Sequence, residues 1–183
     1  MSKIIALKTA VDVVMKRIND PDQWESLVME DREPHTFQAY TDYAGSRISL
    51  HRFEQCLESN AYWHPHRWPC HILVLQGSYH IMIGRVSVYE LIENEMKRAT
   101  KKELDLHLTA GSSYSMIDPQ TWHAVHPKTI CYSLMVNGES WHDHELQSIV
   151  EETEVCKSMD DLDLRVHLTN FRTLLQTHIK HAT

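Results

Sequence analysis

The sequence predicts an all-β core of antiparallel strands with one α-helix at each end, within a single domain of 183 residues. Three observations predict this fold. Apolar residues recur at helical spacing in the first twenty residues and again from about residue 158. Between these ends, short segments rich in β-branched and aromatic residues are separated by turn-forming residues. No internal repeat, low-complexity tract or linker divides the chain.

The N-terminal part, residues 1–45, is predicted to be helical and then irregular. Its first twenty residues place apolar side chains three and four positions apart, and Pro21 ends this pattern. The residues that follow are mixed in character and contain Pro34 and Gly45. This composition predicts irregular structure or short helices over one end of the core.

Residues 46–140 are predicted to form the β core. Residues 86–108 alternate apolar and polar side chains on both sides of a charged tip, ENEMKRATKK, which predicts a long two-stranded hairpin. The strand-like segments in this part of the chain are RISLHRFEQCL, HILVLQ, SYHIMIGRVSVYELIE, ELDLHLTAG, SSYSMI and TICYSLMVNG.

Residues 158–181 are predicted to form the C-terminal helix. Leu164, Leu168, Phe171 and Leu175 recur at helical spacing and share one face. Ser158 together with Asp161 is a candidate cap for the start of this helix.

Composition excludes several functional classes. The net charge is −7 and no run of Lys or Arg interrupts it, so we expect no nucleic-acid partner. No stretch of 18 or more apolar residues is present, and the N-terminus lacks the pattern of a secretory signal, so we expect no membrane span and no export. The four cysteines form no CxxC pair, which favours a reducing, cytoplasmic environment.

Fourteen histidines are unusual for this length, and four of them fall in a specific pattern. His64 and His66 are two residues apart, so on an extended strand their imidazoles point to one face and can share a metal ion. His71 opens the apolar run HILVLQ, and His123 follows the turn-forming sequence IDPQTW. A single HxH pair arises by chance on surface strands, and the second one in this chain, His142 with His144, implies no third ligand.

The first pattern resembles the motifs of the cupin superfamily. HPH, four residues, His71, five residues and Gly77 match the first cupin motif, with histidine where glutamate is usual. DPQTWH matches the second motif at its final residue, His123. Over residues 46–138 this resemblance implies a jelly-roll barrel of six to eight antiparallel strands with a metal inside it. Either four imidazoles bind the metal, or His64, His66 and His123 bind it and His71 lies behind them or in the pocket.

The segment HPHRWPCHILVLQG is also similar to that of cysteine dioxygenases, in which HxH precedes an adjacent His-Cys pair and an L-Q-G turn. Here the pair is reversed, as Cys70-His71, and Asp42 stands where an arginine for the substrate carboxylate is expected. The later His-x-Tyr pair of that family has no counterpart. Acireductone dioxygenases, also cupins, carry the glutamate that this chain lacks.

Three inward-facing neutral imidazoles leave coordination positions open on a metal with five or six ligands. We therefore expect Fe(II), with Zn, Ni or Mn as alternatives, and a dioxygenase or oxygenase reaction on a small polar or anionic molecule. Tyr79, Tyr114 and Tyr132 are the candidate catalytic acids or hydrogen-bond donors, although each is also explained by packing inside a barrel. Arg47 and Arg52 are candidate anion-binding residues if they turn inward.

Two alternatives stay open at this point. The first is a non-redox cupin (an isomerase, epimerase or lyase) that uses Zn, Mn or Ni as a Lewis acid. The second is a small-ligand-binding module without catalysis. Cupins commonly associate through barrel edges, so a homodimer is also expected.

Overall fold

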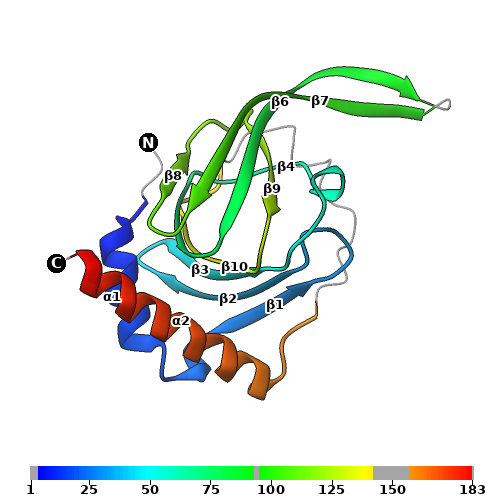
Figure 1. Ribbon diagram of the computed structural model, residues 1–183. Coiled ribbons are helices and arrows are strands. Elements are labelled where there is room, and N and C mark those ends of the chain that lie inside the picture. The colour runs from blue at the N-terminus through cyan, green and yellow to red at the C-terminus, as the bar shows by residue number, and fades with distance from the viewer. Residues whose placement is uncertain (1–3, 93–94, 142–156, 183) are drawn as a thin grey trace.

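Two antiparallel sheets face each other in the computed structural model, which describes residues 4–92, 95–141 and 157–182 (Figure 1). The larger sheet has six strands in the order β1-β2-β3-β10-β5-β8, and the smaller has four in the order β4-β9-β6-β7. The strands of the six-stranded sheet are β1 (Glu25–Met29), β2 (Thr36–Tyr43), β3 (Ser46–Phe53), β10 (Cys131–Asn137), β5 (Cys70–Gln76) and β8 (Ser113–Met116). Those of the four-stranded sheet are β4 (His64–Pro65), β9 (Trp122–Pro127), β6 (Ser78–Ile92) and β7 (Glu95–Thr109).

This architecture confirms the predicted fold class, an antiparallel β core flanked by an N-terminal and a C-terminal helix. The expectation of irregular structure or short helices for residues 22–45 was wrong in one respect, because β1 and β2 lie there and extend the larger sheet. In β2, alternate residues Thr36, Gln38 and Tyr40 face the space between the sheets and are polar. A strand whose inner face is polar lacks the apolar alternation by which strands are recognised in a sequence.

The two α-helices cover the outer face of the six-stranded sheet. Figure 1 shows α1 (Leu7–Arg17) and α2 (Asp161–Ala182) lying together on this side. The predicted apolar face of α2 is buried there, with Phe171 and Leu175 fully inaccessible to solvent. The cap of α2 differs from the prediction: Asp160 Oδ1 accepts a hydrogen bond from the Asp163 amide at 2.8 Å, so Asp160 caps the helix. Two short 3-10 helices, η1 (Pro21–Gln23) and η2 (Glu58–Asn60), complete the fold.

Side-chain alternation gives the six-stranded sheet two different faces. On β3, Ile48 and Leu50 point outward and pack against the helices, whereas His51 points inward. On β10, Leu134 likewise packs outward while Ser133 points inward. The outer face therefore supplies the larger apolar core, and the inner face is free to carry polar groups.

The predicted hairpin is present as β6 and β7, whose strands are each 15 residues long (Figure 1). It extends well beyond the barrel because its neighbour β9 is only six residues long. The turn that leads into β6 requires glycine at position 77. Gly77 has φ +81°, and a Cβ there would lie 2.5 Å from the Ile130 carbonyl oxygen.

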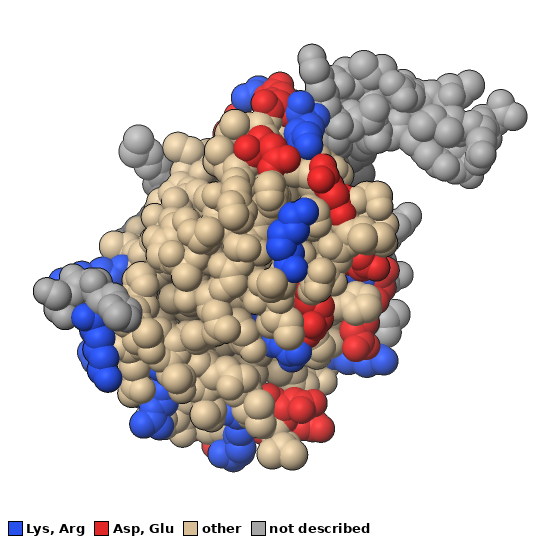
Figure 2. All heavy atoms as spheres, viewed as in Figure 1, with Lys and Arg blue, Asp and Glu red and all other residues tan. Residues whose placement is uncertain are grey.

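Acidic and basic side chains are interspersed on the face shown in Figure 2, around a largely uncharged centre. No helix among the described residues is both long enough and apolar enough to cross a membrane.

The free energy of unfolding of the metal-free protein is expected to decrease as the pH falls from about 6.5 to about 4. Burial lowers the pKa of His51 to about 3 and that of His167 to about 4, so both stay neutral in the folded protein. In the unfolded chain both take up protons below the ordinary value of 6.5. Each histidine then reduces stability by up to about 1.4 kcal/mol per pH unit in this range.

Urea unfolding at a series of pH values measures this dependence. His167 contacts the Leu50 carbonyl through Nε2 at 3.0 Å, and a His167→Gln variant keeps a donor there but cannot titrate. This variant should have a shallower pH dependence than the wild type, and parallel curves for the two proteins would contradict the assignment.

Candidate metal centre

The centre is assembled from two strands of the four-stranded sheet and the residue that follows one of them. β4 pairs with β9 in a register that places His64 directly opposite His123. His66 lies two residues beyond His64, and the two imidazole rings stack with centroids 5.6 Å apart. The HxH spacing thus places the side chains of His64 and His66 on one face of the chain, as predicted. The pairing of β4 with β9 adds His123 as the third histidine.

Three ring nitrogens converge at this point. The His123 Nε2 atom lies 2.8 Å from His66 Nε2 and 3.0 Å from His64 Nε2. Metal–nitrogen bonds of about 2.0–2.1 Å at right angles would place two nitrogens about 3.0 Å apart. All three donor atoms lie within 4.8 Å of one another. The separations therefore fit three imidazoles that bind one transition-metal ion.

The contacts of the other ring nitrogens assign the tautomer of His64. His64 Nδ1 lies 3.2 Å from the Tyr62 carbonyl oxygen, an acceptor, so this nitrogen carries the proton and donates. His66 Nδ1 lies 3.1 Å from the sulfur of Cys70. His123 Nδ1 is buried without a hydrogen-bond partner among the described residues. Metal binding through Nε2 requires the proton of each ring to be on Nδ1, and the three Nε2 lone pairs would then face one another.

The electrostatics keep all three imidazoles neutral. Burial is the main cause that lowers the pKa of His64 to about 4 and that of His66 to about 3. Burial, followed by the neighbouring His64 and His66, holds the pKa of His123 well below its ordinary value. Neutral imidazoles whose lone pairs converge at 2.8–3.0 Å repel one another, and a bound divalent cation removes that repulsion.

The three histidines line a cavity of about 340 Å³ between the two sheets. This volume suits a small molecule. Most of its wall area is apolar, although many of the residues that line it carry polar groups. The polar and charged wall residues outside the histidine triad are Arg32, Glu33, Thr36, Gln38, Tyr40, Arg47, His51, Tyr62, Tyr79, Tyr114, Ser133 and Asn137.

Two arginines lie in the wall of this cavity, and each is near an aspartate, with Arg32 Nε 4.0 Å from Asp31 Oδ1. Arg32 lies with its guanidinium carbon 4.5 Å from the centroid of the Tyr62 ring. Arg47 is 4.2 Å from the Tyr40 ring and pairs with Asp42 at 3.2 Å. Arg52, the other predicted anion-binding candidate, pairs with Glu54 and is absent from the lining.

His71 lies outside the triad, so the four-imidazole alternative is not supported. It occupies β5, where Ile72 points into the cavity, and successive strand residues point to opposite faces. His71 therefore shares the outward side with Leu73, and its Nδ1 lies 2.6 Å from Ser115 Oγ. The motif position that carries glutamate in cupins is thus filled by a residue that faces away from the metal.

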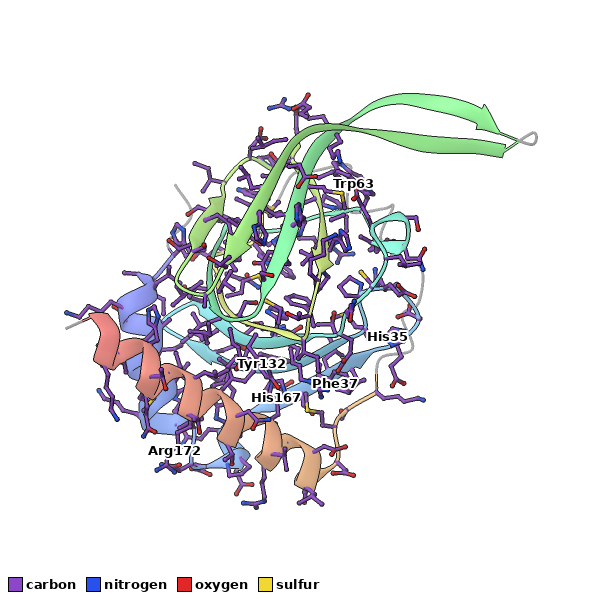
Figure 3. The ribbon with its side chains drawn as sticks, in the orientation of Figure 1. His35, Phe37, Trp63, Tyr132, His167 and Arg172 are labelled. Carbon is purple, nitrogen blue, oxygen red and sulfur yellow. The ribbon has the colours of Figure 1, made fainter. Side chains whose placement is uncertain are left out.

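Tyr132 also lies on the wrong side of its sheet for catalysis. Figure 3 shows it on the side that faces α2, near His167. Its ring packs edge-on against Phe171, with centroids 5.3 Å apart, and it belongs to the larger apolar core. The prediction that Tyr132 is catalytic is therefore wrong.

Tyr79 and Tyr114 line the same cavity as the triad, as predicted, and their hydroxyl oxygens are 3.4 Å apart. Burial raises the pKa of both phenols well above the ordinary value, so they are neutral donors rather than bases. Along β6, Tyr79 is four residues from Ile83, the strand partner of His123, which corresponds to about 13 Å. Their catalytic role stays a prediction.

Sequence reasoning made no site assignment for His51, Gln38 or Asn137, all of which line the cavity. The alternation of residues on β3 could have identified His51 as a cavity residue, because His51 falls on the face opposite to Ile48 and Leu50. The second HxH pair, His142 and His144, lies outside the described residues.

No family model matches the chain, and no curated protein matches it. Several solved structures resemble its fold. The crystal structure of Fe(II)-HppE with the alternative substrate (S)-1-HPP is 15% identical with a TM-score of 0.47, and the match covers 64% of this chain and 57% of that one. A putative sugar phosphate isomerase from Acidithiobacillus ferrooxidans is 13% identical with a TM-score of 0.40, covering 58% of this chain and 60% of that one.

A cupin-2 domain containing protein from Shewanella frigidimarina is 16% identical with a TM-score of 0.38, and the match covers 54% of this chain and 76% of that one. The chain spans little more than half the length of the HppE structure it matches.

Substitution of one triad histidine should weaken binding of Zn(II) by more than about 100-fold, because loss of even an outer partner of a ligand costs about 10–100-fold. His123→Ala tests this, and His71→Ala is the matched control because His71 points away from the triad. Competition with a chromogenic chelator measures both affinities. Equal affinities of the two variants would show that the triad is not the metal site.

Proposed function

We propose that this protein is a metal-dependent enzyme of the cupin type, a non-haem iron oxygenase that acts on a small polar or anionic molecule. The convergence of three neutral imidazole nitrogens in the wall of a cavity between the two sheets carries this proposal. No carboxylate belongs to this donor group, so an Fe(II) ion held there keeps its full double positive charge. Such a site favours an anionic ligand that replaces solvent at the remaining coordination positions.

The cavity wall supports a substrate with hydrogen-bonding groups. Asn137 is 3% exposed, and its Oδ1 atom has no hydrogen-bond partner among the described residues. The indole Nε1 of Trp68 is likewise buried and unpartnered there, and both residues line the cavity. Buried polar atoms without partners are costly, which is explained if a bound molecule supplies the partners.

The residues of the chain take distinct parts in the proposed reaction. His64, His66 and His123 hold the metal, which when bound supplies the redox chemistry and activates O₂. Arg32 and Arg47 contribute positive charge that attracts an anion into the cavity. Asn137 and Trp68 orient the substrate, and the apolar walls exclude water from the reacting groups.

Oxygen consumption tests this function. Protein loaded anaerobically with Fe(II) is mixed with O₂ and a panel of small thiols, enolisable diketones and hydroxycarboxylates. We expect uptake of O₂ that depends on one class of these compounds and is lost in His123→Ala.

Two controls separate oxygenation from other chemistry. Zn(II)-loaded protein should consume no O₂, because Zn(II) has no redox activity. Substrate turnover without O₂ uptake, equal for Zn(II), Mn(II) and Ni(II) forms, would replace the oxygenase with a Lewis-acid isomerase or lyase. Binding of a panel compound without any turnover would indicate a ligand-binding module.

The role of Asn137 predicts an unusual stability effect in the unliganded protein. Asn137→Leu removes a buried acceptor that has no partner, so it should leave the free energy of unfolding unchanged or raise it by about 1 kcal/mol. Gln38→Leu, on the same inner face, breaks the 2.9 Å hydrogen bond to Ser49 Oγ and should cost about 1 kcal/mol or more. Thermal or urea unfolding of both variants measures the difference, and a larger loss for Asn137→Leu would argue that Asn137 is structural.

The homodimer stays a prediction. β7 forms one edge of the four-stranded sheet, and Leu104 and Leu106 on this strand are partly exposed. Light scattering of the full-length protein would determine the oligomeric state.

A further inference from the structure

The environment of His66 differs from that of the other two triad histidines. His64 is held by a backbone carbonyl, that of Tyr62, and His123 has no Nδ1 partner among the described residues. His66 is held by a side chain, because its Nδ1 atom lies 3.1 Å from the sulfur of Cys70. Histidines that bind metals usually donate their second N–H to a carboxylate, a carbonyl or water. A cysteine sulfur in this position is a departure that needs an explanation.

From these contacts we infer that Cys70 is a positioning residue of the metal centre. When His66 binds the metal through Nε2, its Nδ1 must carry the proton, so the N–H donates to the Cys70 sulfur. This hydrogen bond fixes both the tautomer and the rotation of the imidazole. The inference rests on the proposed metal site, and it adds a residue outside the triad that determines how tightly that site binds.

The location of Cys70 makes it a rigid anchor. It is the first residue of β5 and is completely buried. Its neighbours in the core are Ile72 and Met116, and its strand partner on β10 is Asn137. β5 belongs to the six-stranded sheet, whereas His66 directly follows β4 of the four-stranded sheet. The sulfur therefore links a ligand on one sheet to the backbone framework of the other.

The segment between the two residues explains why this link is needed. Residues 66–69 connect β4 to β5, and β4 consists of only two residues, His64 and Pro65. His66 lies outside that strand and lacks its ladder hydrogen bonds. Without the contact to sulfur, no other described side chain makes a hydrogen bond to His66 Nδ1. The orientation of the third ligand thus depends on Cys70.

Cys131 provides a matched control within the same barrel. It is also a free cysteine and also completely buried. Its sulfur donates to the Gln76 carbonyl oxygen at 3.0 Å, and it is not part of the triad or the cavity lining. Cys70→Ala and Cys131→Ala therefore remove the same atom from equally buried positions, and only the first removes a contact to a metal ligand.

Titration of the full-length, chelator-treated protein with Co(II) tests the inference, with affinity and the visible ligand-field spectrum as readouts. We expect Cys70→Ala to weaken Co(II) binding by about 10–100-fold and to shift the ligand-field bands. Cys131→Ala should match the wild type in both readouts. Cys70→Ser retains an acceptor, although its oxygen lies farther from His66 than the sulfur does. This variant should recover part of the Co(II) affinity, a result that a purely structural role for the sulfur would not predict.

Each remaining outcome has a defined meaning. If Cys70→Ala does not fold, Cys70→Val fills the same apolar surroundings without an acceptor and replaces it in the comparison. Equal affinity and identical spectra of the Cys70 and Cys131 variants would overturn the positioning role while the metal site stands. A wild-type protein that binds no Co(II) would instead overturn the metal function itself, and the role of Cys70 with it.

Discussion

The strand register between β4 and β9 is the constraint on which the candidate centre depends. It places His64 opposite His123, and the two-residue spacing of HxH then brings in His66. A slip of one residue in this register would turn His64 to the opposite face and separate it from His123. β9 is itself paired with β6 along its whole length, with His123 opposite Ile83. One ligand therefore lies in the middle of a regular sheet, and the other two are brought to it by a strand of only two residues.

The inner cavity is possible because stability comes from elsewhere. The helices α1 and α2 bury the outer face of the six-stranded sheet and form the larger apolar core with it. The inner face of the same sheet carries Gln38, His51, Ser133 and Asn137, all buried. Polar groups in such positions cost stability unless they are paired. Apolar burial on the opposite side of the sheet compensates for this cost, and the cavity is left with groups that a ligand can use.

The histidines of the centre act together because burial keeps them neutral. Their low pKa values leave three lone pairs available well below the pH at which an exposed histidine becomes protonated. A donor set without a carboxylate neutralises none of the metal charge, so the negative charge that balances it has to come from the substrate. On our proposal, the absence of a carboxylate from the ligand set therefore explains why the site prefers an anionic substrate.

By itself, the sequence determined the helices at both ends, the long hairpin, the antiparallel core and the three candidate ligands His64, His66 and His123. These follow from local periodicity and from motif spacing, which depend on residues close together in the chain. Only the tertiary structure decided which way His71 and Tyr132 point, that β1 and β2 are strands, and that Cys70 contacts His66. The reason is that both faces of the six-stranded sheet are covered, one by helices and one by the opposing sheet. Alternation along a strand shows which residues share a face. When both faces are buried, it does not show which of them points toward the histidine triad.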